Sequence, residues 1–370
     1  MSDALKDIYL HYANTARSKF LTPKRDRDAS RPLIVLENKR IKMRAIAEEL
    51  EEGSVFRSLV EETRNSFYQC GHGTVESSWV HAVRNVLRRS GFYRDSAIDT
   101  PGDLIQGFEK YCNAFTRRER TTTYLAPLEF ISFDGDTMEF GQFRIARFRK
   151  EQLDSLTGKS INEVYYPYAV VDSKRICQYW FLCVQEKDIS PPIGLLPDFS
   201  ESARVDNRYT KFPSAVEPAI QLLTLFDWDV YFLKSETEIE TTTEDPWRFW
   251  QGFKLPIIIR VHDSLYETPW PCPSFAELNI ETIFDDQTGQ ELGERPQVLI
   301  RLDGKETESF RLFVSQCRDL LTLLRLDVGN PWYFFEIALR NLTKAFFAED
   351  LDQLLWHITA IEALVGERGR

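Results

Sequence analysis

The chain has 370 residues, of which 43% are hydrophobic and 28% charged, and its formal net charge is −11. This composition is typical of a globular protein with two or three domains, and it excludes a largely disordered chain. Positive charge is concentrated between Arg17 and Arg44, where there are ten basic residues and three acidic ones. This segment could bind a phosphate-bearing partner, but a solvated basic face that docks on the acidic rest of the protein is favoured.

The cysteines and the apolar stretches indicate the cellular compartment. The six cysteines have neither a CxxC motif nor another paired spacing, which argues against a zinc site and favours free thiols in a reducing environment. The N-terminus lacks the apolar core of a signal peptide, and no stretch approaches the ~20 apolar residues of a membrane span. The sequence therefore predicts a cytoplasmic protein without a membrane partner. Neither GxxxxGK[ST] nor GxGxxG is present, so hydrolysis of nucleoside triphosphates and Rossmann-type binding lack support. No cofactor is expected, and the spacing of the candidate ligands predicts no metal site.

Residues 1–120 are predicted to form a basic, helical N-terminal region. Helical spacing runs over residues 41–64 and 75–89, and Thr100-Pro101 has the pattern of a helix start. The apolar side chains that should face the core of this region are Trp79, Val83, Val86, Leu87, Leu104, Ile105, Phe108, Tyr111, Cys112 and Phe115. The Cys70-Gly71-His72 triplet places a thiol near an imidazole, but it lacks a third ligand and is interpreted as a loop.

Residues 121–302 are predicted to form a β-rich domain with a sensing or regulatory role. Apolar and polar side chains alternate on both sides of Asp134-Gly135-Asp136, which predicts a hairpin with its turn at these residues. Asp285 and Asp286 are likewise interpreted as turn formers. A short helix is expected at 149–156 and strands at 165–171, 176–184, 228–233 and 255–261. The periodicity of residues 215–226 fits a helix or a strand.

Residues 303–370 are predicted to form three amphipathic helices. The first carries an apolar stripe at Phe310, Phe313, Val314, Cys317, Leu320, Leu321 and Leu324. The second starts after Asn330-Pro331 and should bury Phe334, Phe335, Ala338, Leu339, Leu342 and Phe346. On its other side, Glu336, Arg340 and Lys344 are spaced to form a ladder of charges in solvent.

The third helix, at 351–370, carries a carboxylate within its apolar face. At 100° per residue, Glu362 projects between Leu351, Leu355 and Ile358, so we expect it to be buried. A buried Glu needs a cationic or hydrogen-bonding partner, and internal pairing is favoured over catalysis. His357 borders the same face and is interpreted as a partly buried structural histidine.

Three arginines in the 309–326 helix are weak candidates for nucleic-acid binding. Arg311, Arg318 and Arg325 follow one another at seven-residue steps on one flank of the helix. Such a stripe could track a phosphate backbone, but surface arginines that pair with nearby acids are more common.

The C-terminal helices resemble a known family. The segment LDQLLWHITAIEALVGE follows a helix of the type NPWYFFEIALRNLTKAFF, and together they are similar to the start of an Apea-like HEPN domain. The stretches YLAPLEF, FGQFRIARFRKEQLDSL and SAVEPAIQLLTLF are similar to the β-rich regions that precede such domains. The resemblance covers about residues 121–370 and depends on the apolar pattern and the A-(I/L)-E-A-L core.

The resemblance implies a metal-independent ribonuclease or an RNA-binding relative, often in defence or toxin–antitoxin systems and dimeric. In HEPN nucleases an Arg stabilises the charge that builds on the phosphate, and a His at R-x(4–6)-H helps to activate the ribose hydroxyl. None of the histidines, at 11, 72, 81, 262 and 357, has an Arg at this distance upstream. In the family the motif lies on a later helix, so we expect it beyond residue 370; within the chain only Glu362 is a weak catalytic candidate.

The sequence thus predicts an α+β protein and two alternative functions. The first is the regulatory portion of a HEPN-type ribonuclease, with RNA and a protein trigger or antitoxin as partners and a homo-oligomer formed through the C-terminal helices. The second is a non-enzymatic module that binds protein or nucleic acid and assembles through the same helices.

Overall fold

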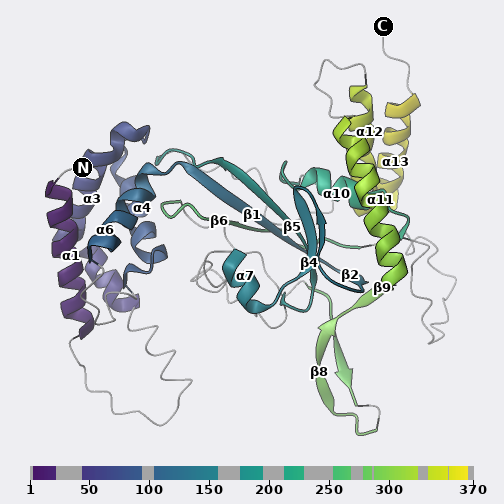
Figure 1. Ribbon diagram of the computed structural model, residues 1–370, viewed down its shortest axis with the longest axis horizontal. Helices are drawn as coiled ribbons and strands as arrows, with labels where there is room; N and C mark the ends of the chain where they lie inside the picture. The colour runs from purple at the N-terminus through teal and green to yellow at the C-terminus, as the bar shows by residue number, and fades with distance from the viewer. Residues whose placement is uncertain are drawn as a thin grey trace. The chain divides into compact units, whose positions relative to one another are not determined.

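The structure belongs to the α+β class, with helices at both ends of the chain and sheet in the middle (Figure 1). The computed structural model describes residues 3–21, 44–93, 104–156, 176–194, 212–228, 253–267, 278–285, 287–323, 332–348 and 350–365. Its described part forms two compact units: unit 1 comprises Met1–Thr121, Lys187–Asp198 and Asp263–Pro269, and unit 2 comprises Thr122–Glu186, Phe199–His262 and Trp270–Arg370. The predicted C-terminal region, 303–370, therefore groups with the sheet in unit 2.

Unit 1 is a layer of helices around an aromatic core. Its helices are α1 (Asp3–Leu21), α3 (Ser54–Phe67), the 3-10 helix η1 (Tyr68–Cys70), α4 (Glu76–Arg89) and α6 (Leu104–Thr116). Trp79 is fully buried and donates its indole N–H to the Gly73 carbonyl at 2.7 Å, so the ring loses no hydrogen bond on burial. The predicted core faces of α4 and α6 are confirmed, except that Ile105 is 60% exposed. Gly53 interrupts the helix predicted over 41–64.

Unit 2 is built around a five-stranded sheet with the order β3-β4-β5-β1-β6. Its strands are β1 (Glu119–Leu128), β3 (Met138–Phe140), β4 (Phe143–Arg147), β5 (Trp180–Ile189) and β6 (Ile259–His262). β3 pairs antiparallel with β4, β4 with β5, and β1 with β6. The predicted strands at 176–184 and 255–261 are present but begin later, at Trp180 and Ile259. Residues 165–171 and 229–233 lie outside the described residues.

The hairpin predicted around residues 134–136 is wrong. The strand before this turn, β2 (Phe130–Phe133), pairs parallel with β9 (Val298–Leu302), while the hairpin is formed by β3 and β4. The chain bends away from β1 at Phe130, whose φ is +67°, a value uncommon outside glycine. Gly141 supplies the positive φ of the real hairpin turn. The alternation of apolar and polar side chains continues through Phe130, so the sequence pattern does not indicate the bend.

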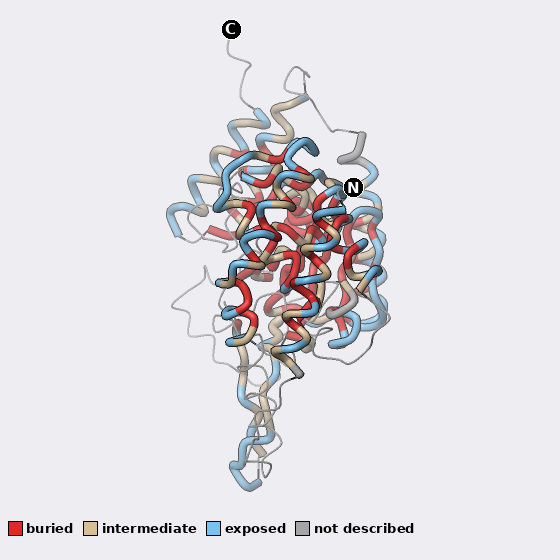
Figure 2. The backbone as a smooth tube through the Cα atoms, turned by 90° about the vertical axis from the view of Figure 1, so that its left-hand side faces the viewer, coloured by how far each residue is buried: buried red, intermediate tan, exposed pale blue. Residues whose placement is uncertain are grey.

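Both faces of the sheet pack against other elements and form two separate cores. Figure 2 shows the buried residues gathered in the interior and the exposed ones on the outside. One core is shared with α10 (Glu217–Thr224), α11 (Gly304–Leu323) and α12 (Tyr333–Phe347), and it includes Phe310, Val314 and Phe347. The other core is shared with α7 (Lys150–Leu156), the short helix expected at 149–156. Residues 215–226 thus contain a helix. Asp303 caps α11, accepting hydrogen bonds from the N–H groups of Lys305 and Glu306.

Two strands that the sequence did not predict form a separate ribbon in unit 2. β7 (Ile280–Phe284) and β8 (Glu291–Pro296) pair antiparallel and project from the rest of the unit (Figure 1). Asp285 starts the turn between them by accepting hydrogen bonds from the N–H groups of Gln287 and Thr288. Its predicted role as a turn former is therefore confirmed, whereas Asp286 lies outside the described residues.

The chain continues from α12 into α13 (Asp350–Val365), and these two helices pack side by side (Figure 1). In α12, Ala338 and Leu339 are buried as predicted, but Phe334, Phe335, Leu342 and Phe346 are only half-buried. None of the described helices is both long and apolar enough to cross a membrane.

Candidate functional site

Helix α13 packs on α12 through a face of small and aromatic side chains. Ala360 of α13 is buried, as are Ala345 and Ala348 at the end of α12. The Lys344 ammonium lies 4.3 Å from the centre of the Trp356 ring, a cation–π contact between the two helices. Lys344 is therefore not part of a solvent ladder as predicted. In that ladder only Arg340 and Glu336 pair, at 3.3 Å, and Arg340 also reaches Glu217 on α10.

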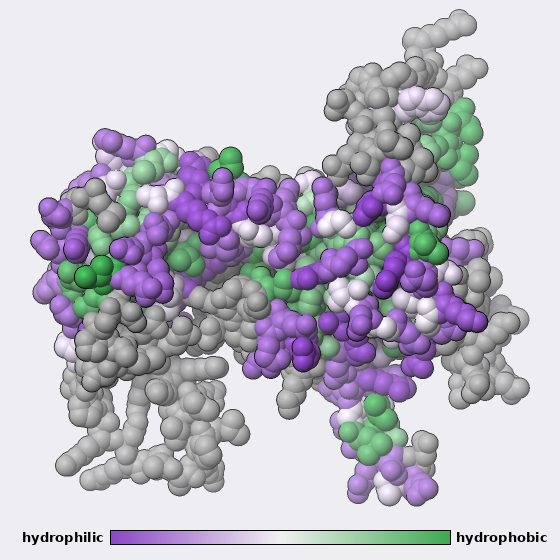
Figure 3. All heavy atoms as spheres, in the orientation of Figure 1, coloured by the Kyte–Doolittle hydropathy of each residue, from purple (hydrophilic) through white to green (hydrophobic). Residues whose placement is uncertain are grey.

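The opposite face of α13 is apolar and exposed. Its large side chains are between 43% and 75% exposed, namely Leu351, Leu354, Leu355, Ile358, Ile361 and Val365. Figure 3 shows hydrophobic atoms gathered on this helix, at the upper right of the view. A helix that is apolar on two opposite sides is typical of the interior of a bundle. We therefore identify this surface, called here the open face of α13, as the candidate functional site.

The structure corrects the prediction that Glu362 is buried, because its side chain lies exposed on the open face. The periodicity identified the apolar face correctly, but α12 covers the other side of the helix. His357 is half-buried on the flank of α13, in agreement with its interpretation. Glu362 and His357 are on the same helix five residues apart and are not brought together into a catalytic pair.

The predicted arginine stripe makes contacts within the protein. Arg311 is half-buried on α11 and lies 3.7 Å from Glu308. Arg318 pairs with Asp319 at 2.8 Å and also lies against the β3–β4 turn at Gly141. Arg325 lies outside the described residues. The two described arginines thus follow the interpretation of surface ion pairs.

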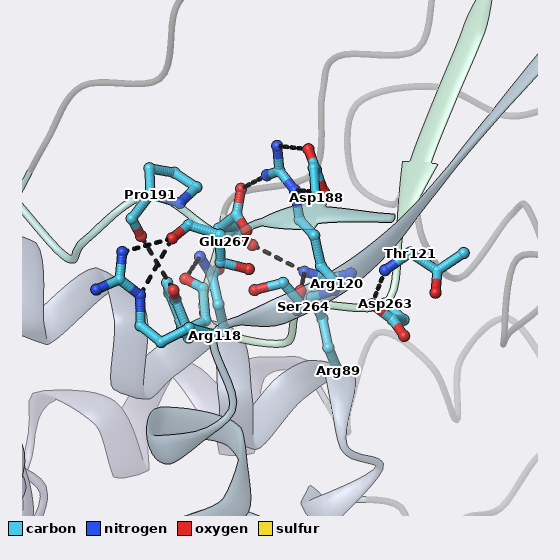
Figure 4. A network of polar contacts seen from close by, with 12 residues as sticks. Arg89, Arg118, Arg120, Thr121, Asp188, Pro191, Asp263, Ser264 and Glu267 are labelled. Atoms are coloured by element: carbon cyan, nitrogen blue, oxygen red, sulfur yellow. Dashed lines mark hydrogen bonds and ion pairs between the residues drawn. The ribbon is translucent and has the colours of Figure 1, made fainter. Parts of the chain in front are cut away.

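A buried cluster of polar contacts in unit 1 was not predicted from the sequence. Arg120 donates from Nε to Oδ1 of Asp188 at 2.7 Å and from Nη2 to Oδ2 at 2.6 Å, and Nη1 contacts Glu267 (Figure 4). The Arg120 side chain is only 8% exposed, so these carboxylates compensate a desolvated charge. Two neighbouring arginines also contact these parts of the chain: Arg117 pairs with Asp263, and Arg118 donates a hydrogen bond to the Ser190 carbonyl.

Through these contacts the arginine-rich run at 117–120 binds two segments that are distant from it in the sequence, 188–190 and 263–267. On α4, Arg89 adds hydrogen bonds to the carbonyls of Ser264 at 2.5 Å and Glu267 at 2.8 Å. The sequence signal was the RRER run itself, but its partners are distant in the chain. Because every one of these contacts ties backbone segments together, we interpret the cluster as structural.

A second buried cluster surrounds Glu51, again in unit 1. Arg88 donates to both carboxylate oxygens, at 2.8 and 2.5 Å, and Arg84 lies 2.9 Å from Oε2. Tyr93 donates to Oε1 at 3.1 Å and is hydrogen-bonded to Tyr12. Burial raises the pKa of both tyrosines above the ordinary value of a phenol. They therefore stay protonated near neutral pH, and the carboxylate is fully compensated by its partners.

His72 is held in one tautomer by two backbone groups of unit 1. Its Nε2 lies 2.9 Å from the Phe115 carbonyl, and its Nδ1 accepts a hydrogen bond from the Ile193 N–H at 3.1 Å. A ring that donates from Nε2 and accepts at Nδ1 is neutral. Burial lowers the pKa of His72, against the hydrogen bond to Phe115, which raises it. The predicted loop at Cys70 to His72 thus contains a structural histidine.

Neither a metal site nor a reactive thiol at Cys112 is present among the described side chains. Within the described ranges, no group of three or more His, Cys, Asp and Glu side chains is placed to hold a metal ion. Burial raises the pKa of the Cys112 thiol to about 11, which keeps it protonated and unreactive. Comparison with protein-family models, curated proteins and solved structures finds no match.

Proposed function

We propose that the protein is the regulatory and scaffolding portion of a HEPN-type ribonuclease, acting in the cytoplasm in defence or toxin systems. In this proposal, α12 and α13 are two helices of a larger bundle, and the open face of α13 receives the remaining helical layer. The sheet of unit 2 anchors α11 and α12, and so holds the bundle on a rigid support.

The observation that carries the proposal is that α13 is apolar on two opposite sides and that α12 covers only one of them. Exposed apolar surface of this extent is unfavourable in water and marks an interaction site in most folded proteins. The resemblance of this helix pair to an Apea-like HEPN domain indicates what kind of layer is expected there. Glu362, in the family-like sequence Ala360-Ile361-Glu362-Ala363-Leu364, would lie at the edge of that layer.

The catalytic groups in this proposal are contributed by other helices. Cleavage of RNA without a metal requires a cation for the charge on the phosphate and a base for the 2′-hydroxyl. The 370 residues contain no R-x(4–6)-H motif that could supply both. In this proposal the chain is the part that senses a trigger and positions the nuclease helices.

The test compares the complete product of the native reading frame with residues 1–370 for cleavage of total RNA in buffer containing EDTA. The proposal expects cleavage by the complete product, loss of that cleavage when the Arg or His of an R-x(4–6)-H motif is changed to Ala, and none by residues 1–370. Absence of cleavage by the complete product, or a reading frame that adds no such motif, would make the ribonuclease assignment wrong.

A second candidate function is a non-enzymatic binding module that assembles through the open face of α13. The missing Arg-His motif favours this alternative. It expects assembly through α13 without RNA cleavage in any form of the protein, so the same experiment separates the two functions.

A further inference from the structure

The ribbon of β7 and β8 has outer edges with which no other described strand pairs. None of the described residues from Ile280 to Pro296 is buried. A two-stranded ribbon without a covered face is only marginally stable in water, and a third strand or a packed face stabilises it. The N–H and C=O groups along an unpaired strand edge are a template for the addition of such a strand.

The backbone groups of β7 alternate between β8 and the outer edge. Just before the strand, the Asn279 carbonyl accepts a hydrogen bond from the Gln297 N–H at 3.3 Å. Just after it, the Asp285 N–H donates to the Gln290 carbonyl at 2.8 Å. Because the backbone groups of successive residues point to opposite sides of an antiparallel strand, the odd-numbered residues face β8. The N–H and C=O groups of the even-numbered residues, Thr282 among them, therefore point to the outer edge.

The outer edge of β8 is less suited to pairing than that of β7. Leu292 is the extra residue of a β-bulge, since it lies between the β8 partners of Ile283 and Phe284. Pro296, at the end of β8, has no backbone N–H to donate. Bulges and prolines blunt exposed strand edges in this way. In contrast, β7 has the sequence IETIF, which is rich in β-branched and aromatic residues and free of glycine and proline.

Buried groups of unit 2 hold the base of the ribbon. Glu129, which is 2% exposed, accepts hydrogen bonds from the backbone N–H of Asn279 at 2.6 Å and from its side-chain amide at 2.8 Å. The Tyr179 hydroxyl donates to the Asn279 carbonyl at 2.9 Å. The chain is thus fixed immediately before β7 begins. A segment that adds to this edge meets a strand that is already formed, which lowers the entropic cost of binding.

The charges and the apolar side chains of the ribbon indicate the chemistry of the added segment. The charged side chains among its described residues give a net charge of −3, namely Glu281, Asp285, Glu291, Glu294 and Arg295. Phe284 and Leu292 are 57% and 66% exposed, and Figure 3 shows apolar atoms gathered on the ribbon, at the bottom of the view. Because side chains alternate along a strand, Phe284 lies on one face of β7, and Glu281 and Asp285 lie on the other.

We propose that the outer edge of β7 binds an extended, basic segment of a partner protein, which adds to the ribbon as a third strand. Apolar side chains of the segment lie beside Phe284 on one face, and its cationic side chains lie beside Glu281 and Asp285 on the other. Backbone hydrogen bonds to the edge supply affinity, and the alternation of side chains supplies specificity. The inference goes beyond the proposed function, because it uses no residue of α13 and requires no cleavage of RNA.

The test uses a short, fluorescently labelled peptide of alternating Val and Lys, whose binding to the full chain is measured by anisotropy. Thr282→Pro removes an N–H that points to the outer edge but leaves the hydrogen bonds between β7 and β8 in place. Thr282→Ala is the matched control, because it changes the same exposed side chain and keeps the N–H. The wild type and Thr282→Ala are expected to bind alike, and Thr282→Pro roughly tenfold more weakly.

Two further peptides separate strand addition from general attraction, with the protein unchanged. A Val–Lys peptide that is methylated on its backbone nitrogens keeps its charges but has no N–H groups to donate, so it should not bind. A peptide of alternating Val and Glu keeps its N–H groups, but like charges repel, so it should bind roughly tenfold more weakly than the Val–Lys peptide. These results do not depend on how Thr282→Pro folds.

Equal affinity of Thr282→Pro and Thr282→Ala for the Val–Lys peptide would overturn the proposal. Binding of the methylated peptide as tight as that of the unmethylated one would do the same, as would a wild type that does not bind the Val–Lys peptide at millimolar concentration. A wild type that self-associates, together with a monomeric Thr282→Pro, would show that a second copy of the chain covers this edge, and the assignment to a partner protein would be wrong.

Discussion

The ammonium of Lys344 on α12 lies 4.3 Å from the centre of the Trp356 ring on α13. This contact joins the helix that packs on the sheet core to the helix that carries the open face. Lys344→Met should keep most of the packing of the side chain but lose the cation–π attraction, worth about 0.5–1 kcal/mol.

The expected result of Lys344→Met is faster hydrogen exchange in residues 350–365 and an unchanged pattern in α4 and α6, measured by mass spectrometry. Lys305→Met is the control, because Lys305 is exposed at the start of α11. Equal exchange in the variant and the wild type over α13 would show that the contact does not stabilise this helix.

Loss of Arg120 should destabilise unit 1 strongly. Arg120→Met leaves the carboxylates of Asp188 and Glu267 without their cation, and Glu267 is only 11% exposed. Removal of one partner from such a buried pair costs about 3–5 kcal/mol. We expect a decrease of this size in the free energy of unfolding, measured by urea denaturation.

Arg117, three positions before Arg120, provides the control variant. Arg117 pairs with Asp263 at 3.0 Å, but its side chain is 60% exposed, and such surface pairs contribute at most about 1 kcal/mol. Arg117→Met should therefore change the free energy of unfolding little. Similar losses in both variants would contradict the view that burial gives Arg120 its importance.

His72 should make the stability of unit 1 depend on pH. Its folded-state pKa lies below that of an unfolded histidine, about 6.5, so below this pH the unfolded chain binds the proton more readily. Stability is therefore complete above pH 6.5 and falls as the pH decreases toward the folded-state pKa, by at most about 1.4 kcal/mol per pH unit. Protonation also removes the acceptor for the Ile193 N–H.

The measurement is the free energy of unfolding at pH 7 and pH 5 for the wild type and His72→Gln. The variant should be less stable at pH 7, because it loses optimal hydrogen bonds to Phe115 and Ile193, but its stability should decrease less on acidification. An identical decrease in both proteins would assign the pH dependence to other groups.

The parts of the fold that the sequence predicted are those with a strong local pattern. The core faces of α4 and α6, including Trp79 and Phe115, follow directly from helical periodicity. The β2–β9 pairing was missed because it joins residues far apart in the chain, and because Phe130 bends the backbone without a glycine or proline to mark the place. The partners of Arg120, at 188 and 267, are equally remote in sequence.

The candidate site shows a different limit of prediction from the sequence. Periodicity showed that α13 has an apolar face around Ile358, but it cannot show whether a neighbouring element covers that face. Burial of Glu362 was expected because an apolar face usually points to the core, whereas the core side of α13 is the one with Trp356 and Ala360. The structure was therefore needed to reveal that the larger apolar surface faces outward.

The most direct test of the account is cleavage of total RNA by the complete product of the native reading frame in buffer containing EDTA. The account predicts cleavage by the complete product, and loss of that cleavage when the Arg of an R-x(4–6)-H motif is changed to Ala with an unchanged circular dichroism spectrum. Absence of cleavage by the complete product, or cleavage that survives the substitution, would contradict the ribonuclease assignment.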